Sequence, residues 1–241
     1  MPVKRPGVWR FFLLQSSRND RTIDGPGFFY AIYPFLKALA DDEGQLREMA
    51  GRHAGYFNAN PIMAPSIAGA VMNLETRRKA GEDITAERIE RTKSALSSAL
   101  TARGDYFFEV ILLPFALTIG SIFAIYHSYI GPVIFLAFYN LFHLRSRIGG
   151  YGAGLFHGED VWRELARTLF RAQSYLAGCA AFASGVFGAL VFLRAWSFGG
   201  PRLVLWGLFV VAGVSLLRLK FGVFWTVLAA FAATALFLST W

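Results

Sequence analysis

Cysteine is almost absent from this chain of 241 residues, and histidine is scarce. The one cysteine, Cys179, lies inside an apolar run and cannot form a disulfide within the chain. The four histidines, His53, His127, His143 and His157, show no metal-binding spacing such as His-Glu-x-x-His. We therefore predict no metal site.

Motifs for covalent and phosphate chemistry are also missing. The sequence contains no Gly-x-Ser-x-Gly elbow and no P-loop. The glycine-rich stretch 149–158 lacks the Lys-Ser/Thr pair that a phosphate loop needs, so we interpret it as a flexible helix terminus. The sequence predicts no catalytic residue and no cofactor, and it indicates a protein that is not an enzyme.

Charge is sparse in the second half of the chain. The last 136 residues hold thirteen charged side chains, whereas the first 105 hold twenty-seven. Apolar runs lie between the charged clusters, at 106–127, 129–144, 174–193, 203–217 and 221–241. A bilayer core about 30 Å thick needs roughly 20 apolar residues as helix, so the two short runs suggest half-spans, re-entrant segments or helices buried in protein. We predict an all-α, polytopic helical membrane protein whose transmembrane region is 106–241.

No comparable apolar run occurs in residues 1–105, which predict a cytoplasmic or interfacial helical region with an amphipathic N-terminal part. Residues 62–74 are apolar but too short to span a bilayer, and Pro65 and Gly69 interrupt them. We expect a short apolar hairpin there, either entering the bilayer or packing on it. Thr85 is expected to cap a solvated helix.

Positive charge prevails, with a net charge of +8. In membrane proteins Lys and Arg concentrate on the cytoplasmic side, so we expect the N-terminus in the cytoplasm, with no cleavable signal peptide. The basic residues are dispersed rather than gathered in a stripe with exposed aromatic residues, which predicts no nucleic-acid partner.

Polar residues at membrane depth are the first candidates for a functional site, because ionisable groups in lipid usually face a cavity or a partner. Glu109 lies one helical turn after Asp105, although Asp105 fits a helix N-cap equally well. Asn140 and His143 lie three residues apart, and Arg147 continues their face. This face predicts either hydrogen bonds between helices or the lining of a polar solute path.

Two amides form a second group of candidates. Asn58 and Asn60 precede the short apolar element at 62–74. Short apolar elements interrupted by Gly or Pro are a pointer to transporter binding sites, and amides offer directed donors and acceptors to sugar hydroxyl groups.

Several stretches together resemble one family, the IID membrane subunit of the mannose/fructose/sorbose family of the sugar phosphotransferase system. Residues 27–37 are similar to its aromatic N-terminal block ending in Pro-x-Leu-Lys. Residues 53–64 are similar to its Phe-Asn-Thr-x-Pro-x-Met-Ala block. Residues 131–140, followed by His143, Arg147, Tyr151 and Gly152, are similar to its Gly-Pro hairpin and its Phe-Asn block. The order and spacing agree over roughly residues 25–160.

The resemblance implies a transport subunit of the bacterial inner membrane. Such a subunit forms, with a IIC membrane subunit, the pathway for phosphorylation-coupled uptake of a hexose-type sugar. The cytoplasmic IIA and IIB components carry the phosphate, and family members assemble as higher oligomers of paired subunits. Under this interpretation Asn58, Asn60, Asp105, Glu109, Asn140 and His143 contact the substrate pathway or the subunit interface.

One block departs from the family pattern. The family has Gly-Pro-Leu-Ala-Gly-x-Gly-Asp where this chain has Ser98-Ala-Leu-Thr-Ala-Arg-Gly-Asp105, so that only the leucine and the final Gly-Asp agree. The next family block holds Trp, Gly, Thr and Arg where this chain has Glu109, Val110, Ile111 and Leu113. These departures favour a second hypothesis, a non-transporting scaffold or regulatory subunit that derives from IID and recruits soluble phosphotransferase proteins.

Overall fold

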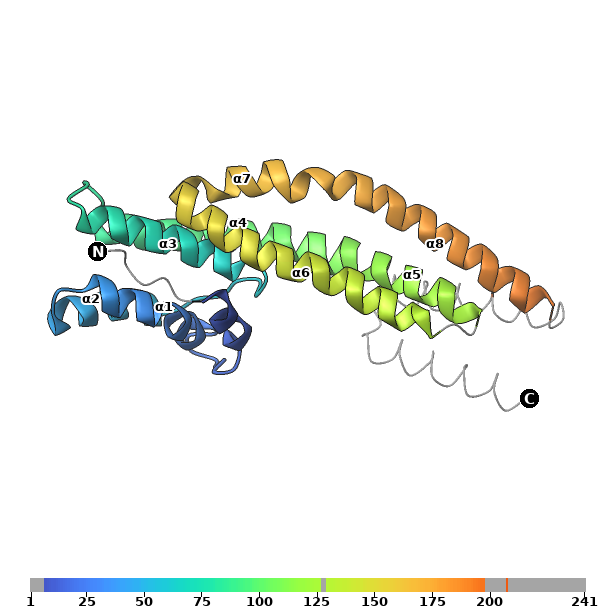
Figure 1. Cartoon of the computed structure of the whole chain (residues 1–241), viewed down its shortest axis with the longest axis horizontal. Coiled ribbons are helices and arrows are strands. Elements are labelled where there is room, and N and C mark those ends of the chain that lie inside the picture. Colours follow the sequence, from blue (N-terminus) through green and yellow to red (C-terminus); the bar gives the residue numbers. More distant parts are fainter. Residues whose placement is uncertain (1–6, 127–128, 198–206, 208–241) are drawn as a thin grey trace. The chain divides into compact units, whose positions relative to one another are not determined.

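A computed structural model describes residues 7–126, 129–197 and 207, which are mainly helical and contain no strand (Figure 1). The helices, in chain order, are η1 (Val8–Leu13), α1 (Gly25–Leu39), α2 (Glu43–Ala54), α3 (Ala64–Lys79), α4 (Ala86–Asp105), η2 (Tyr106–Leu112), α5 (Leu113–Ile125), α6 (Ile130–His157), η3 (Gly158–Asp160), α7 (Val161–Thr168), η4 (Phe170–Ala172) and α8 (Gln173–Trp196). The all-α prediction is confirmed. Backbone contacts divide the chain into two compact units, Met1–Ser184 and Gly185–Trp241, and the contacts described below lie within the first unit.

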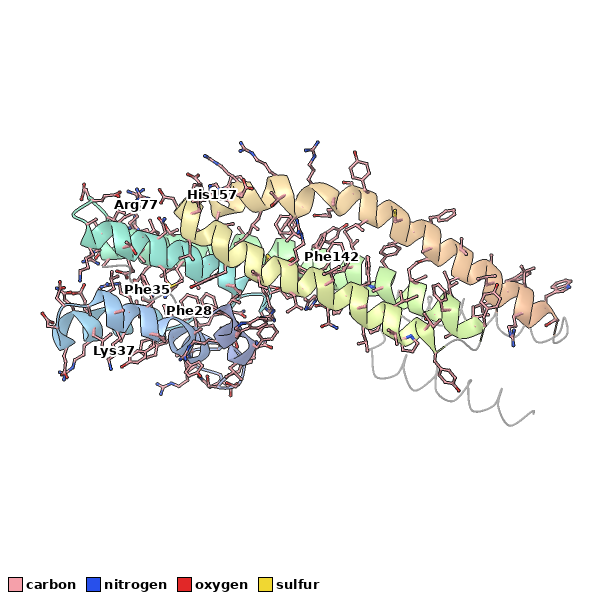
Figure 2. All side chains as sticks on the ribbon, in the orientation of Figure 1. Phe28, Phe35, Lys37, Arg77, Phe142 and His157 are labelled. Carbon is pink, nitrogen blue, oxygen red and sulfur yellow. The ribbon has the colours of Figure 1, made fainter. Side chains whose placement is uncertain are left out.

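Helix α1 is amphipathic. Its buried side chains recur at helical spacing: Phe28, Ala31, Ile32, Phe35, Leu36 and Leu39. Phe28 and Phe35 point toward α3, whereas Lys37 points away from it (Figure 2). Phe28 also stacks on Phe57, with the ring centroids 4.1 Å apart, so the segment that leads into α3 is anchored to α1.

Helix α3 corrects the expected hairpin at 62–74. Residues 64–79 form one uninterrupted helix, and its residues from Ala64 to Met72 are buried. Pro65 lies in the first turn, where the missing N–H has no helical partner to lose, so it begins the helix rather than breaking it. The location of this helix, entering the bilayer or packing on it, stays a prediction.

Helices α4, η2 and α5 form one continuous helical stretch, Ala86–Ile125. Thr85 caps α4 as predicted, since its Oγ1 accepts a hydrogen bond from the Arg88 N–H at 3.2 Å. In η2 the backbone widens into a π-helix, and the Leu113 N–H bonds the Phe108 carbonyl five residues earlier. Pro114 follows directly, and the wider turn relieves the clash of its ring with the preceding turn.

Helix α6 packs along α3 over the glycine-rich stretch (Figure 1). A Cβ atom on Gly154 would lie 2.1 Å from the Ser66 carbonyl oxygen, and one on Gly69 would lie 2.5 Å from the Tyr151 carbonyl oxygen. The two backbones therefore touch, and only glycine fits at these positions. The predicted helix terminus at 149–158 is confirmed, because α6 ends at His157, but this terminus is not free: its glycines form the backbone contact with α3.

Two helical stretches in the described part of the chain, Ala86–Ile125 and Ile130–Arg194, contain windows long and apolar enough to cross a membrane. They include the predicted apolar runs at 106–127, 129–144 and 174–193, apart from the last two residues of the first run, of which 127 is undescribed, and Tyr129, the first residue of the second run. The runs at 203–217 and 221–241 lie outside the described residues, Gly207 apart. The predicted boundary between 105 and 106 coincides with the junction of α4 and η2, where the helix continues without a break. The division into cytoplasmic and transmembrane regions remains a prediction.

Candidate functional site

The predicted site residues fall into two groups in the structure. Asn58, Asn60 and Asp105 lie where the segment before α3 meets the end of α4, and Glu109 follows one turn later, exposed on η2. Asn140 and His143 lie elsewhere, on α6. The first group brings together two sequence blocks that are more than forty residues apart.

Asn60 ties these two blocks together. Its side-chain N–H donates to Asp105 Oδ1 at 2.7 Å, and its Oδ1 accepts from the Ile62 N–H at 2.9 Å. Its backbone N–H donates to Thr101 Oγ1 at 3.0 Å. Asn60 is 4% exposed, so both its side chain and its backbone N–H are used in fixing the start of α3 against α4.

Gly104 permits this close contact. A Cβ atom at this position would lie 2.7 Å from Met63 Cγ and 3.2 Å from Asn60 Cγ. Gly104 and Asp105 are two of the residues of the divergent block that agree with the family pattern. The structure gives both residues a packing reason: the glycine makes room for Asn60, and the aspartate accepts its hydrogen bond.

An Asn60→Ala variant is expected to lose about 2 kcal/mol of free energy of unfolding, because it removes the donor to Asp105 and leaves the buried Ile62 N–H unpaired. Equilibrium unfolding of the purified chain in detergent measures this loss. Asn58→Ala is the matched control, since Asn58 is exposed and makes no hydrogen bond within the described residues. Equal unfolding free energies for the two variants would contradict the structural role of Asn60.

A pocket of about 420 Å³ lies between α4 and the segment before α3; we call it the α4 pocket. Its lining residues are Tyr56, Phe57, Asn58, Lys93, Ser94, Ser97, Ser98, Thr101, Ala102 and Asp105. Two of the predicted site residues, Asn58 and Asp105, are thus part of one concave surface. The serines were not predictable as site residues, because hydroxyl groups along one face of a charged helix are also ordinary solvent-exposed residues.

The predicted polar face of α6 does not join this pocket. Asn140 is exposed, and its side-chain N–H donates to the Leu136 carbonyl of its own helix at 2.8 Å. His143 packs against aromatic rings, with centroids 5.1 Å from Phe108 and 4.2 Å from Tyr139. Within the described residues neither side chain makes a hydrogen bond to another helix. Their part in a solute path or subunit interface remains a prediction.

Sequence reasoning missed a buried ionic cluster that joins α2, α3 and α4. Arg52 and His53 on α2 both contact Glu75 of α3: Arg52 Nε lies 3.1 Å and Nη2 3.2 Å from its two carboxylate oxygens, and His53 Nε2 lies 2.9 Å from Oε1. Lys93 of α4 donates to the Arg52 carbonyl at 2.5 Å. The exposed fractions are 8% for Arg52, 0% for His53 and 1% for Glu75.

The protonation states of this cluster follow from burial and from the neighbouring charges. Burial lowers the pKa of His53 and outweighs the attraction of Glu75, so the imidazole is neutral. Burial raises the pKa of Glu75, but the hydrogen bonds from His53 and Arg52 and the positive charge of Arg52 together hold it below its usual value, so the carboxylate is ionised. His53 Nε2–H therefore donates to Glu75. The cluster joins three helices through buried hydrogen bonds, so we interpret it as a structural clamp.

Comparison with known proteins adds to this picture. Residues 5–193 match the sequence profile of the PTS system mannose/fructose/sorbose family IID component, PTS being the phosphotransferase system. The mannose-specific EIID component of Escherichia coli K12 is 29% identical over 180 residues, and the match covers 74% of this chain and 63% of that protein. The sorbose-specific EIID component of Lacticaseibacillus casei is 27% identical over 177 residues, covering 73% and 62%.

The fold also matches a solved structure. In the complex of the mannose transporter ManYZ with microcin E492, one chain aligns with a TM-score of 0.59 at 23% identity, covering 97% of this chain and 94% of that one. At this identity the likeness concerns the fold. The match to the curated relatives spans less than two thirds of their length.

Proposed function

Because the chain belongs to the IID component family of the mannose/fructose/sorbose phosphotransferase systems, we propose that it is the IID subunit of a sugar permease. In this role it forms, with a IIC subunit, the membrane pathway for phosphorylation-coupled uptake of a hexose-type sugar. The observation that carries the proposal is the family match, which extends over residues 5–193 and includes most of α8. The two stretches that could cross a membrane support it.

The proposal assigns phosphoryl transfer to the cytoplasmic IIA and IIB components rather than to this chain. His53 fits this assignment, because it is fully buried and bonded to Glu75, out of reach of a phosphoryl donor. The proposed location is the bacterial inner membrane with the N-terminal region cytoplasmic, supported by the charge of residues 1–105. We further propose higher oligomers of paired IIC and IID subunits.

The transport role is favoured over the scaffold hypothesis. The relatives above are named as sugar-specific EIID components, and the divergent block keeps the contacts of Gly104 and Asp105 with the start of α3. Of the other departures, Glu109 and Val110 lie exposed on η2, so they leave these contacts intact. The two relatives are named for different sugars, mannose and sorbose, so the proposal specifies the class of sugar, a hexose, and not one particular sugar.

Sugar uptake by cells that carry the cognate IIC, IIA and IIB components tests this function. With this chain present we expect accumulation of phosphorylated mannose, fructose or sorbose, and without it a fall to the background of cells that lack all components. Radiolabelled uptake followed by separation of sugar phosphates measures both. Restoring the chain from a plasmid is the control for polar effects. Undiminished phosphorylation-coupled uptake in its absence would refute the transport role.

A further inference from the structure

We propose that the α4 pocket is a binding site for the hydroxyl groups of a neutral monosaccharide. The inference rests on the proposed function and adds to it a place on this subunit where the sugar is held. The pocket volume of about 420 Å³ lies within the range of ~300–1,000 Å³ that is typical of small-molecule sites. Three features of its lining determine the class of ligand.

The first feature is a stripe of hydroxyl groups along one face of α4. Ser94, Ser97, Ser98 and Thr101 follow one another at helical spacing and all line the pocket. Ser97 donates to the Lys93 carbonyl, and Thr101 accepts from the Asn60 N–H. Ser94 and Ser98 are exposed, and their side chains make no hydrogen bond within the described residues. Both hydroxyl groups are therefore available to a ligand as donors and acceptors.

The second feature is the arrangement of the other groups around this stripe. Asn58 contributes an amide with no partner in the described part of the chain, and one Asp105 oxygen accepts from Asn60 while the other has no such donor. Tyr56, 65% exposed, brings an aromatic ring to the same cavity. Amide, carboxylate and hydroxyl groups next to an aromatic ring match a ligand that alternates hydroxyl groups with C–H faces.

The third feature is the shortage of charge that an anionic ligand would need. Lys93 is the one cation of the lining, and it is 7% exposed with its ammonium group already donating to the Arg52 carbonyl. The carboxylate of Asp105 faces the same cavity. A sugar phosphate would bring its negative charge close to this carboxylate, and the lining contains no arginine that could bind the phosphate through two hydrogen bonds. A neutral polyol therefore fits better than a sugar phosphate.

The position of the pocket suits a sugar pathway. Asp105 is the last residue of α4, and the apolar run predicted from the sequence begins at the next residue. The pocket therefore lies at the end of this predicted span. Ser98 and Thr101, two of the four hydroxyl residues of the lining, belong to the block in which this chain departs from the family pattern.

Protection of an engineered cysteine tests the site. The full chain, purified in nanodiscs with its IIC subunit, carries Ser98→Cys in a Cys179→Ser background, because the native Cys179 is exposed. We expect mannose, glucose, fructose or sorbose, added one at a time, to slow maleimide labelling. The rate should fall roughly fourfold at a sugar concentration of three times Kd, since a quarter of the sites is then free. Ser94→Cys, also exposed and in the lining, is the second probe.

Ala99→Cys is the matched control, because Ala99 is the exposed neighbour of Ser98 and does not line the pocket. Slowing at both serine positions but not at Ala99 supports the proposal. Equal slowing at all three positions, slowing by inorganic phosphate alone, or no slowing by any of the four sugars would overturn it. The uptake experiment and the labelling experiment can fail independently. Normal sugar uptake together with a Ser98→Cys labelling rate that no sugar slows would refute sugar binding in the α4 pocket and leave the transport role intact.

Discussion

A Gly154→Ala variant is expected to lose about 3 kcal/mol of free energy of unfolding, or to fail to accumulate in the membrane. The added Cβ would lie 2.1 Å from the Ser66 carbonyl oxygen and 2.8 Å from the Ala70 nitrogen. Both are backbone atoms of α3, so no side-chain rotation relieves the clash and the helices must separate. Since α3 is buried along most of its length, separation exposes apolar surface on both sides. Thermal unfolding followed by size-exclusion chromatography in detergent measures the effect.

The same helix contains its own controls. A Cβ atom on Gly149 or on Gly152 would meet no atom of another helix within 4 Å, so alanine at either site adds helix propensity without a clash. We expect these two variants to be unchanged or stabilised by about 0.5–1 kcal/mol. A Gly154→Ala protein that unfolds at the temperature of Gly152→Ala would show that α3 and α6 are not in backbone contact.

The contact that Gly154 makes with α3 was not predictable from the sequence. The Thr85 cap depends on residues a few positions apart, so it was predictable from one sequence. The contact of Gly154 with Ser66 joins residues 88 positions apart, and nothing near Gly154 in the sequence reveals its partner. A glycine-rich stretch with an unknown partner is indistinguishable from a flexible one.

The candidate site shows the same division. The sequence predicts Asn58, Asn60 and Asp105 as site residues, and the structure brings them to one place. Their separate functions were not predictable, because the difference between buried Asn60 and exposed Asn58 depends on α4. Arg52, Glu75 and Lys93 are not among the residues that the sequence predicts as a site. Each lies in a helix rich in charge, where ion pairing with solvent-exposed neighbours is the usual outcome.

A Glu75→Ala variant is expected to cost about 3–5 kcal/mol of free energy of unfolding, because it leaves the buried Arg52 guanidinium without its bidentate partner. The loss should fall toward the lower end, since Glu48 still contacts Arg52 at 2.6 Å. Glu82→Ala is the control: its pair with Arg77 is largely exposed, so its removal should cost at most about 1 kcal/mol. Equilibrium unfolding in detergent at pH 7 compares the two, and equal losses would contradict a buried clamp.

The same cluster makes stability depend on pH in a predictable direction. The folded pKa of His53 lies below its ordinary value of 6.5, so the unfolded chain binds a proton there that the folded chain does not, and stability falls as the pH drops below about 6.5. The folded pKa of Glu75 also lies below its ordinary value of 4.5, so its contribution is lost as the pH falls through that value. Both groups therefore destabilise the protein on acidification. A His53→Gln variant should flatten the upper part of this decline, between about pH 6.5 and 5, while keeping the lower part. An unfolding free energy of the wild-type chain that stays constant from pH 7 to pH 5 would show that His53 is not held neutral in the folded state.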